Sequence, residues 1–142
     1  MPNTTLRILT RDGIQYVYDQ TRGKILSIPK LYLKAGTNRR TVTNEYLHLE
    51  GDQVSLPVGD AMLRKATIIG LNAQCESAHT WTIKIFIKGN PVPVVILPIV
   101  SGTMGQNLTL NEDIASANVL LYKVEGTNIP FPRIMLELAW RL

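Results

Sequence analysis

At residues 80–88 the chain reads Thr-Trp-Thr-Ile-Lys-Ile-Phe-Ile-Lys, in which large apolar residues stand at every second position. One side of an extended chain therefore carries Trp81, Ile83, Ile85 and Ile87, and the other carries Thr82, Lys84, Phe86 and Lys88. A period of two with β-branched residues is typical of a strand that buries one face against a core. This stretch predicts that the protein is built from β-strands.

The same period recurs in two other stretches, residues 133–142 and, more weakly, residues 66–75. In the first, the apolar side consists of Ile134, Leu136, Leu138, Trp140 and Leu142. In the second, it consists of Thr67, Ile69, Leu71, Ala73 and Cys75. Turn-forming sequences such as Lys-Gly-Asn-Pro at residues 88–91 separate the strands. Short strands at this spacing predict an all-β, antiparallel β-sandwich of the jelly-roll or Greek-key type.

Residues 91–100 read Pro-Val-Pro-Val-Val-Ile-Leu-Pro-Ile-Val and are apolar on both sides of the expected strand. A central strand buried on both faces would have this pattern. An edge strand that packs against another copy of the chain would have it too, and the prolines favour an edge because proline cannot donate to a ladder. An exposed apolar edge invites aggregation, so we expect self-association here. The residues singled out for self-association are Val94, Ile96, Pro98 and Tyr122.

The charge is distributed unevenly along the 142 residues, a length that suits one domain. The net charge is +4, and only 18% of the residues are charged. Residues 1–42 hold eight basic and two acidic residues, a net charge of +6, which leaves −2 for residues 43–142. Turns and short apolar pieces alternate in this first part. We therefore predict a basic, extended N-terminal attachment arm with short hairpins over residues 1–59, followed by a β-sandwich body over residues 60–142.

The basic arm has three possible interpretations. Lysine and arginine could neutralise phosphates of a nucleic acid. They could instead steer the arm to an acidic protein surface, on which its tyrosines would anchor. The third possibility is that the arm is simply solvated. The basic residues are scattered singly, and Arg39 and Arg40 are the one adjacent pair. This distribution does not favour nucleic acid, and we expect a protein partner.

Catalytic and metal-binding patterns are weak. Cys75 and His79 could form a nucleophile and its base, but a free cysteine is more often a small buried apolar residue. Glu112 and Asp113 could bind a cation, although they lack the spacing of a calcium loop. The single cysteine excludes a disulfide within the chain. The longest apolar run is far shorter than the roughly 20 residues of a membrane span. We expect no enzyme activity, no cofactor, no metal and no membrane association.

Five segments together carry a family resemblance. Residues 16–27 read Tyr-Val-Tyr-Asp-Gln-Thr-Arg-Gly-Lys-Ile-Leu-Ser, and residues 44–47 read Asn-Glu-Tyr-Leu. Residues 63–74 read Leu-Arg-Lys-Ala-Thr-Ile-Ile-Gly-Leu-Asn-Ala-Gln, residues 81–83 Trp-Thr-Ile, and residues 132–141 Pro-Arg-Ile-Met-Leu-Glu-Leu-Ala-Trp-Arg. These segments resemble structural proteins of tailed bacteriophages, the small jelly-roll proteins found as capsid decoration (cement) proteins, head fibres and tail-fibre modules.

The resemblance implies a homotrimer that is made in the host bacterial cytoplasm and assembled onto the capsid surface of the virion. It implies a non-enzymatic protein that binds the major capsid protein and stabilises the shell. The chain is shorter than a full tail fibre, which favours the decoration protein. The alternative is a tail-fibre or spike module that binds a host receptor or a carbohydrate. The residues expected to attach to the capsid are Tyr16, Tyr18, Arg22 and Lys24.

Overall fold

The computed structural model describes residues 7–37, 40–49 and 60–142, and all regular elements within these residues are β-strands. They are β1 (Leu9–Arg11), β2 (Ile14–Asp19), β3 (Lys24–Gly36), β4 (Thr41–Val42), β5 (Glu45–Tyr46), β6 (His48–Leu49), β7 (Asp60–Ala61), β8 (Ala66–Ile87), β9 (Val95–Asn107), β10 (Glu112–Ile114), β11 (Val119–Glu125), β12 (Ile129–Pro130) and β13 (Arg133–Arg141). Within the described residues there is no helix long and apolar enough to cross a membrane.

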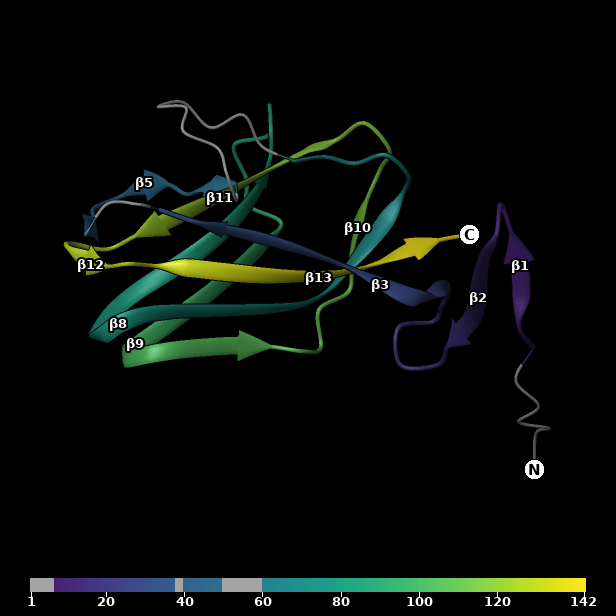
Figure 1. Cartoon of the computed structure of the whole chain (residues 1–142), viewed down its shortest axis with the longest axis horizontal. Coiled ribbons are helices and arrows are strands. Elements are labelled where there is room, and N and C mark those ends of the chain that lie inside the picture. Colours follow the sequence, from purple (N-terminus) through teal and green to yellow (C-terminus); the bar gives the residue numbers. More distant parts are fainter. Residues whose placement is uncertain (1–6, 38–39, 50–59) are drawn as a thin grey trace.

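Eleven strands form one antiparallel sheet that curls over on itself into an open half-barrel of the sandwich type. The long strands β8 and β9 pass together from one layer to the other through a bend. The first part of β8 pairs with β13, and its last part pairs with β11. Figure 1 shows β3 and β13 running nearly horizontally in front, with the β8–β9–β11 layer crossing diagonally behind them. The predicted all-β antiparallel fold is confirmed.

The two layers are termed sheet I and sheet II. Sheet I contains β3, β13, residues 66–74 of β8 and residues 104–107 of β9. Sheet II contains residues 95–99 of β9, residues 81–87 of β8, and β11. The last strand of the chain, β13, lies between β3 and β8, so strands that are distant in sequence become neighbours. Crossings of this kind are characteristic of Greek-key and jelly-roll sandwiches.

The core fills the space between the two sheets, and it receives alternate side chains from each. Its large buried members include Trp81, Ile83, Ile85, Leu120, Tyr122, Val124, Ile134, Leu136 and Leu138. Burial of one such side chain contributes about 1.5–3 kcal/mol to folding. The alternation predicted at residues 80–88 and 133–138 is thus confirmed as the pattern that builds the core. It fails after Leu138, where the register with β3 shifts: Ala139 is buried in a second cluster and Trp140 is only partly buried.

The side assignment predicted for residues 66–75 is wrong in its first half, because β8 contains a bulge there. Glu137 of β13 pairs with Gly70, whereas the next residue, Leu138, pairs with Ile68. Ile69 is the extra residue, and a shift of one residue exchanges the two faces of a strand. Ile68 therefore points into the core before the bulge, and Leu71 does so after it.

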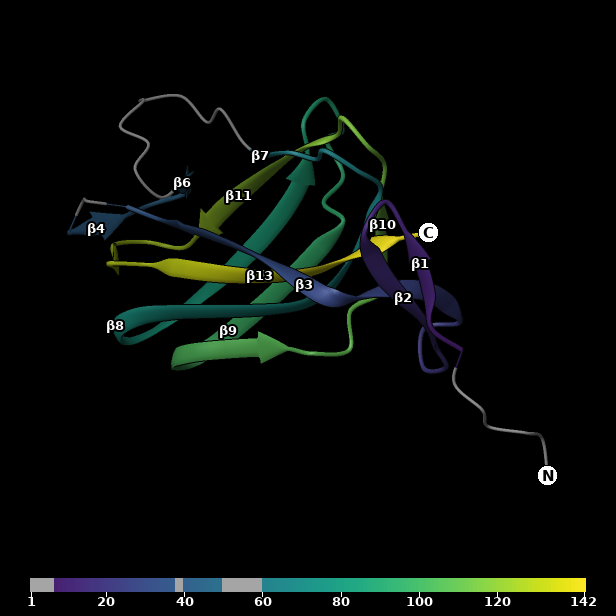
Figure 2. The same cartoon turned by 45° about the vertical axis from the view of Figure 1, so that its right-hand side comes forward.

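The predicted separation of the N-terminal arm from the body also needs correction. Strand β3 pairs with β13 along most of its length, and Ala35, Val42 and Leu47 belong to the same core as the later strands. These residues gain their ladder hydrogen bonds and apolar burial inside the sandwich, so they are not part of a detached arm. The β1–β2 hairpin alone stands beside the end of the sandwich, near the C-terminus (Figure 2). The boundary predicted at residues 51–59 lies outside the described residues.

Candidate binding surfaces

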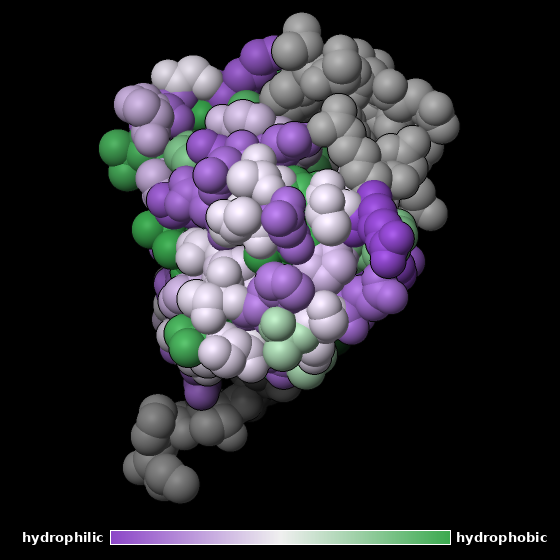
Figure 3. Space-filling model, turned by 90° about the vertical axis from the view of Figure 1, so that its left-hand side faces the viewer, coloured by the Kyte–Doolittle hydropathy of each residue, from purple (hydrophilic) through white to green (hydrophobic). Residues whose placement is uncertain are grey.

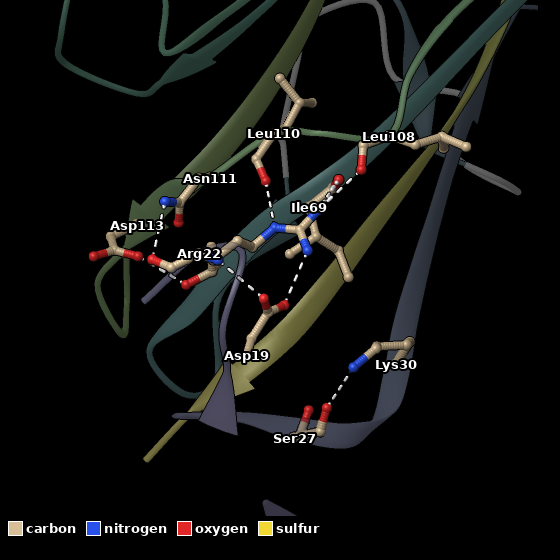
Figure 4. A network of polar contacts seen from close by, with 10 residues as sticks. Asp19, Arg22, Ser27, Lys30, Ile69, Leu108, Leu110, Asn111 and Asp113 are labelled. Atoms are coloured by element: carbon tan, nitrogen blue, oxygen red, sulfur yellow. Dashed lines mark hydrogen bonds and ion pairs between the residues drawn. The ribbon is translucent and has the colours of Figure 1, made fainter. Parts of the chain in front are cut away.

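The turn between β2 and β3 is fastened to the segment after β9 by Arg22 (Figure 4). Its guanidinium donates to the Asp19 carboxylate at 3.0 Å and to three backbone carbonyls, those of Ile69 at 3.0 Å, Leu108 at 3.0 Å and Leu110 at 2.7 Å. Because these bonds engage the guanidinium within its own chain, Arg22 holds the fold together. Its predicted role in capsid attachment stays a prediction.

A second polar cluster surrounds Asp113. Its Oδ1 lies 2.6 Å from Lys24 Nζ, accepts a hydrogen bond from the Thr67 hydroxyl at 2.7 Å, and lies 3.6 Å from Arg141 Nε. Burial raises the pKa of Asp113, but hydrogen bonds from Lys24 and Thr67 and the charge of Arg141 outweigh it, and the net pKa is lowered. Two cations already neutralise this carboxylate, which is unsuited to a metal. The described part of the chain contains no cluster of three or more potential metal ligands.

The four residues predicted for attachment do not form one exposed surface. Tyr16 is 3% exposed, so its side chain cannot reach a partner while the hairpin is folded, and its predicted role is wrong. Lys24 pairs with Asp113. Tyr18 is 52% exposed on the β1–β2 hairpin, and its attachment role stays a prediction.

On β9 the structure separates the apolar run into two sides. Val95, Leu97 and Ile99 are buried, and the intervening residues Ile96 and Pro98 face outward with Val100. Ile96 is 55% exposed and Val100 is 78% exposed. These three outward residues are termed the β9 row. Among the described strands, β9 pairs with β8 alone, which confirms the predicted edge position.

The other two residues predicted for self-association belong to the core. Tyr122 is 1% exposed and points inward from β11, and Val94 packs against the core cluster. The burial of Tyr122 contradicts its predicted contact with another copy, whereas Val94 is only partly buried and its contact stays a prediction. Val100 was not singled out, although the alternation of the strand places it on the same side as Ile96.

The charges beside the β9 row, on the outer face of sheet II, find partners within the chain. Lys84, which pairs with Ile96 in the ladder, forms a 2.9 Å ion pair with Glu125. Lys123 lies 3.9 Å from the same carboxylate and 5.7 Å from the ring centroid of Tyr46. The row thus forms an apolar edge next to two lysines that share one carboxylate.

The outer face of sheet I is more polar. Lys34, Met135, Asn72 and Gln106 lie side by side across its four strands, and the next row contains Arg133, Gln74 and Met104. The amides are joined to one another. Asn72 Nδ2 donates to Gln106 Oε1 at 3.2 Å, and Gln74 Nε2 donates to Asn72 Oδ1 at 3.2 Å. This surface is termed the amide face.

Tyr32 and Glu137 are also on the amide face, opposite each other on β3 and β13. The Tyr32 side chain is 52% exposed. Its hydrogen bond with the Glu137 carboxylate raises the pKa of the phenol, because that bond is lost when the hydroxyl is deprotonated. The carboxylate of Glu137 is thus partly satisfied by its neighbour.

The bend of β8 contains Cys75 and His79. Cys75 Sγ and His79 Nδ1 lie 3.1 Å and 2.9 Å from the same Ser77 carbonyl oxygen. Burial raises the pKa of the Cys75 thiol, which disfavours the reactive thiolate. Figure 3 views the molecule from this end, where hydrophilic and near-neutral residues cover most of the surface and hydrophobic residues form separate spots. This region offers no activated nucleophile among the described residues.

Comparisons with known proteins assign no family. Neither the protein-family models nor the curated proteins contain a match to this chain. A solved structure described as "CBM4 structure and function" is similar over 96% of this chain and 78% of its own, with 12% sequence identity and a TM-score of 0.33. A similarity this low does not transfer the function of that protein.

Proposed function

We propose that this chain is a bacteriophage virion structural protein, a capsid decoration (cement) protein that assembles as a homotrimer and binds the major capsid protein. The observation that carries the proposal is the β9 row. Three outward apolar residues on an edge strand are an aggregation hazard in a lone subunit, and a second copy of the chain would cover them. Its work is binding rather than catalysis, and it is assembled onto the capsid surface after synthesis in the host bacterial cytoplasm.

The proposed mechanism is the reinforcement of capsid seams. Each copy adds contact area across a junction between neighbouring capsomers, which internal DNA pressure tends to open. A trimer presents three such contacts at once, so that the second and third form at a high effective concentration. Weak individual contacts then suffice for stable attachment.

Sedimentation equilibrium of the purified chain tests the self-association. A trimer is expected, and a monomer at micromolar concentration would contradict it. Cryo-electron microscopy of particles that contain the chain tests the location. Density on the icosahedral shell supports the decoration protein, whereas density confined to the tail would favour a receptor- or carbohydrate-binding module. The burial of Trp81 removes one of the two tryptophans on which a sugar could stack.

A further inference from the structure

Within the amide face, two exposed cations from opposite ends of the chain meet. Lys34 lies on β3, in the basic N-terminal part, and Arg133 lies at the start of β13. Lys34 pairs with Met135, two residues from Arg133 on the same side of the neighbouring strand. Residues in this diagonal relation are roughly 7–8 Å apart, close enough to act on one ligand group or on two adjacent ones. The fold therefore assembles a basic site that no single stretch of sequence contains.

The uncharged residues around these cations have the composition of a protein interface. Tyr32, Met104 and Met135 are each at least 40% exposed. Tyrosine, methionine and arginine are enriched in protein–protein interfaces relative to the rest of the surface. Methionine adapts its shape to the partner, and tyrosine offers a large contact area at a small cost in conformational entropy.

The amides supply directed hydrogen bonds on a rigid support. Asn72, Gln74 and Gln106 hold one another through the two bonds described above. Each amide group has two donors and two acceptor lone pairs, so each keeps capacity for an outside partner. Because the amides lie on paired strands, little further order must be imposed when a partner binds.

The charge of the amide face determines which charge a binding partner should carry. Lys34 and Arg133 carry two positive charges on this face near Glu137, whose carboxylate bonds with Tyr32. We infer that the amide face is a docking surface for the acidic surface of a protein partner. The inference deepens the proposed function, because that partner would be the capsid protein. It also replaces the hairpin with the sheet as the attachment site.

Binding of a random copolymer of L-glutamate and L-tyrosine to the full chain tests the inference. Amide shifts in NMR spectra are expected to change on β3, on β13 and around Asn72 and Gln106. The variant Lys34→Glu/Arg133→Glu is expected to lose about tenfold or more in affinity. Arg7→Glu/Arg11→Glu, which makes the same change in net charge on exposed residues at and before β1, is the matched control and should bind within about twofold of the parent chain.

Other results would overturn the inference: no binding, shifts elsewhere, or equal losses in the two variants, which would indicate unspecific attraction. Binding of alginate at the same face with equal or greater affinity would instead assign the site to an acidic glycan. If the charge-reversed chain does not fold, as judged by circular dichroism, Lys34→Gln/Arg133→Gln replaces it with the same expectation in direction. Sedimentation of each variant separates this test from the proposed trimer, because the amide face is not expected to affect self-association.

Discussion

The two sheets enclose the same core, yet their outer faces differ in the residues that they expose to solvent. On sheet II, Lys84 and Lys123 share the single carboxylate of Glu125 in the middle strands, and the exposed apolar residues lie at the β9 edge. On sheet I, amides, cations and methionines alternate across four paired strands. An apolar edge needs cover, whereas a polar face is stable in water and free to select a partner. This difference underlies the two proposals, in which the β9 row serves self-association and the amide face serves docking.

The largest effect is expected from removing the core that supports both faces. Leu136→Ala should lower the free energy of unfolding by about 2–5 kcal/mol, because Leu136 is fully buried between the sheets and the cavity would not close. Met135→Ala, the adjacent residue on the amide face, is the control and should change it by about 0.5 kcal/mol or less. Urea unfolding followed by circular dichroism measures both. Equal losses would contradict the assignment of the two residues to opposite sides of β13.

A second variant targets the passage of β9 from one sheet to the other. A Cβ atom at Gly105 would lie 2.6 Å from Ile99 Cγ1, so Gly105→Ala should destabilise the fold by about 1–3 kcal/mol through overpacking. At Gly36 the nearest atom would be Arg133 Cβ at 3.6 Å, an ordinary contact. Gly36→Ala is therefore the control. A smaller effect at Gly105 than at Gly36, measured by thermal unfolding, would contradict the close packing of the bend.

The role of the β9 row in self-association is tested by placing charged residues in it. Ile96→Lys/Val100→Lys should shift the chain toward monomer, with a dissociation constant raised by about tenfold or more, while the fold persists because both side chains point outward. Lys34→Glu on the amide face is the control and should leave the assembly intact. Sedimentation velocity over a dilution series reports the result. An unchanged oligomer in the lysine variant would remove the β9 row from the interface.

The smallest effect is expected from acid. For Asp19, burial raises the pKa, but hydrogen bonds and the charge of Arg22 outweigh it, so the pKa of Asp19, like that of Asp113, is lowered from 3.8. The stabilisation from these carboxylates is complete above their pKa in the unfolded chain and is lost as the pH falls below 3.8 toward the lowered folded values. Between pH 6 and pH 2, which lie roughly two units on either side of the ordinary carboxyl pKa, the free energy of unfolding should therefore fall less in Asp19→Asn/Asp113→Asn than in the parent chain. Identical pH profiles for the variant and the parent chain would show that these two carboxylates do not stabilise the folded chain.

The sequence by itself determined the fold class and most of the core. Alternation at residues 80–88 and 133–138 correctly predicted which side chains are buried, because side-chain direction in a strand follows from its period of two. The edge position of β9 could also be predicted, since the prolines of residues 91–98 limit pairing. The virion assignment rests on the resemblance and stays a proposal.

Only the tertiary structure decided where residues from distant parts of the chain meet. The bulge at Ile69 depends on pairing with β13, and no local sequence pattern predicts this bulge. The sequence gives no sign that the Arg22 guanidinium bonds with three distant carbonyls, one in β8 and two in the segment after β9. Lys34 and Arg133 became neighbours because β13 inserts beside β3. Strand period is a local property of the backbone, whereas register and strand order arise from long-range pairing, so a site built across strands is visible only after the chain has folded.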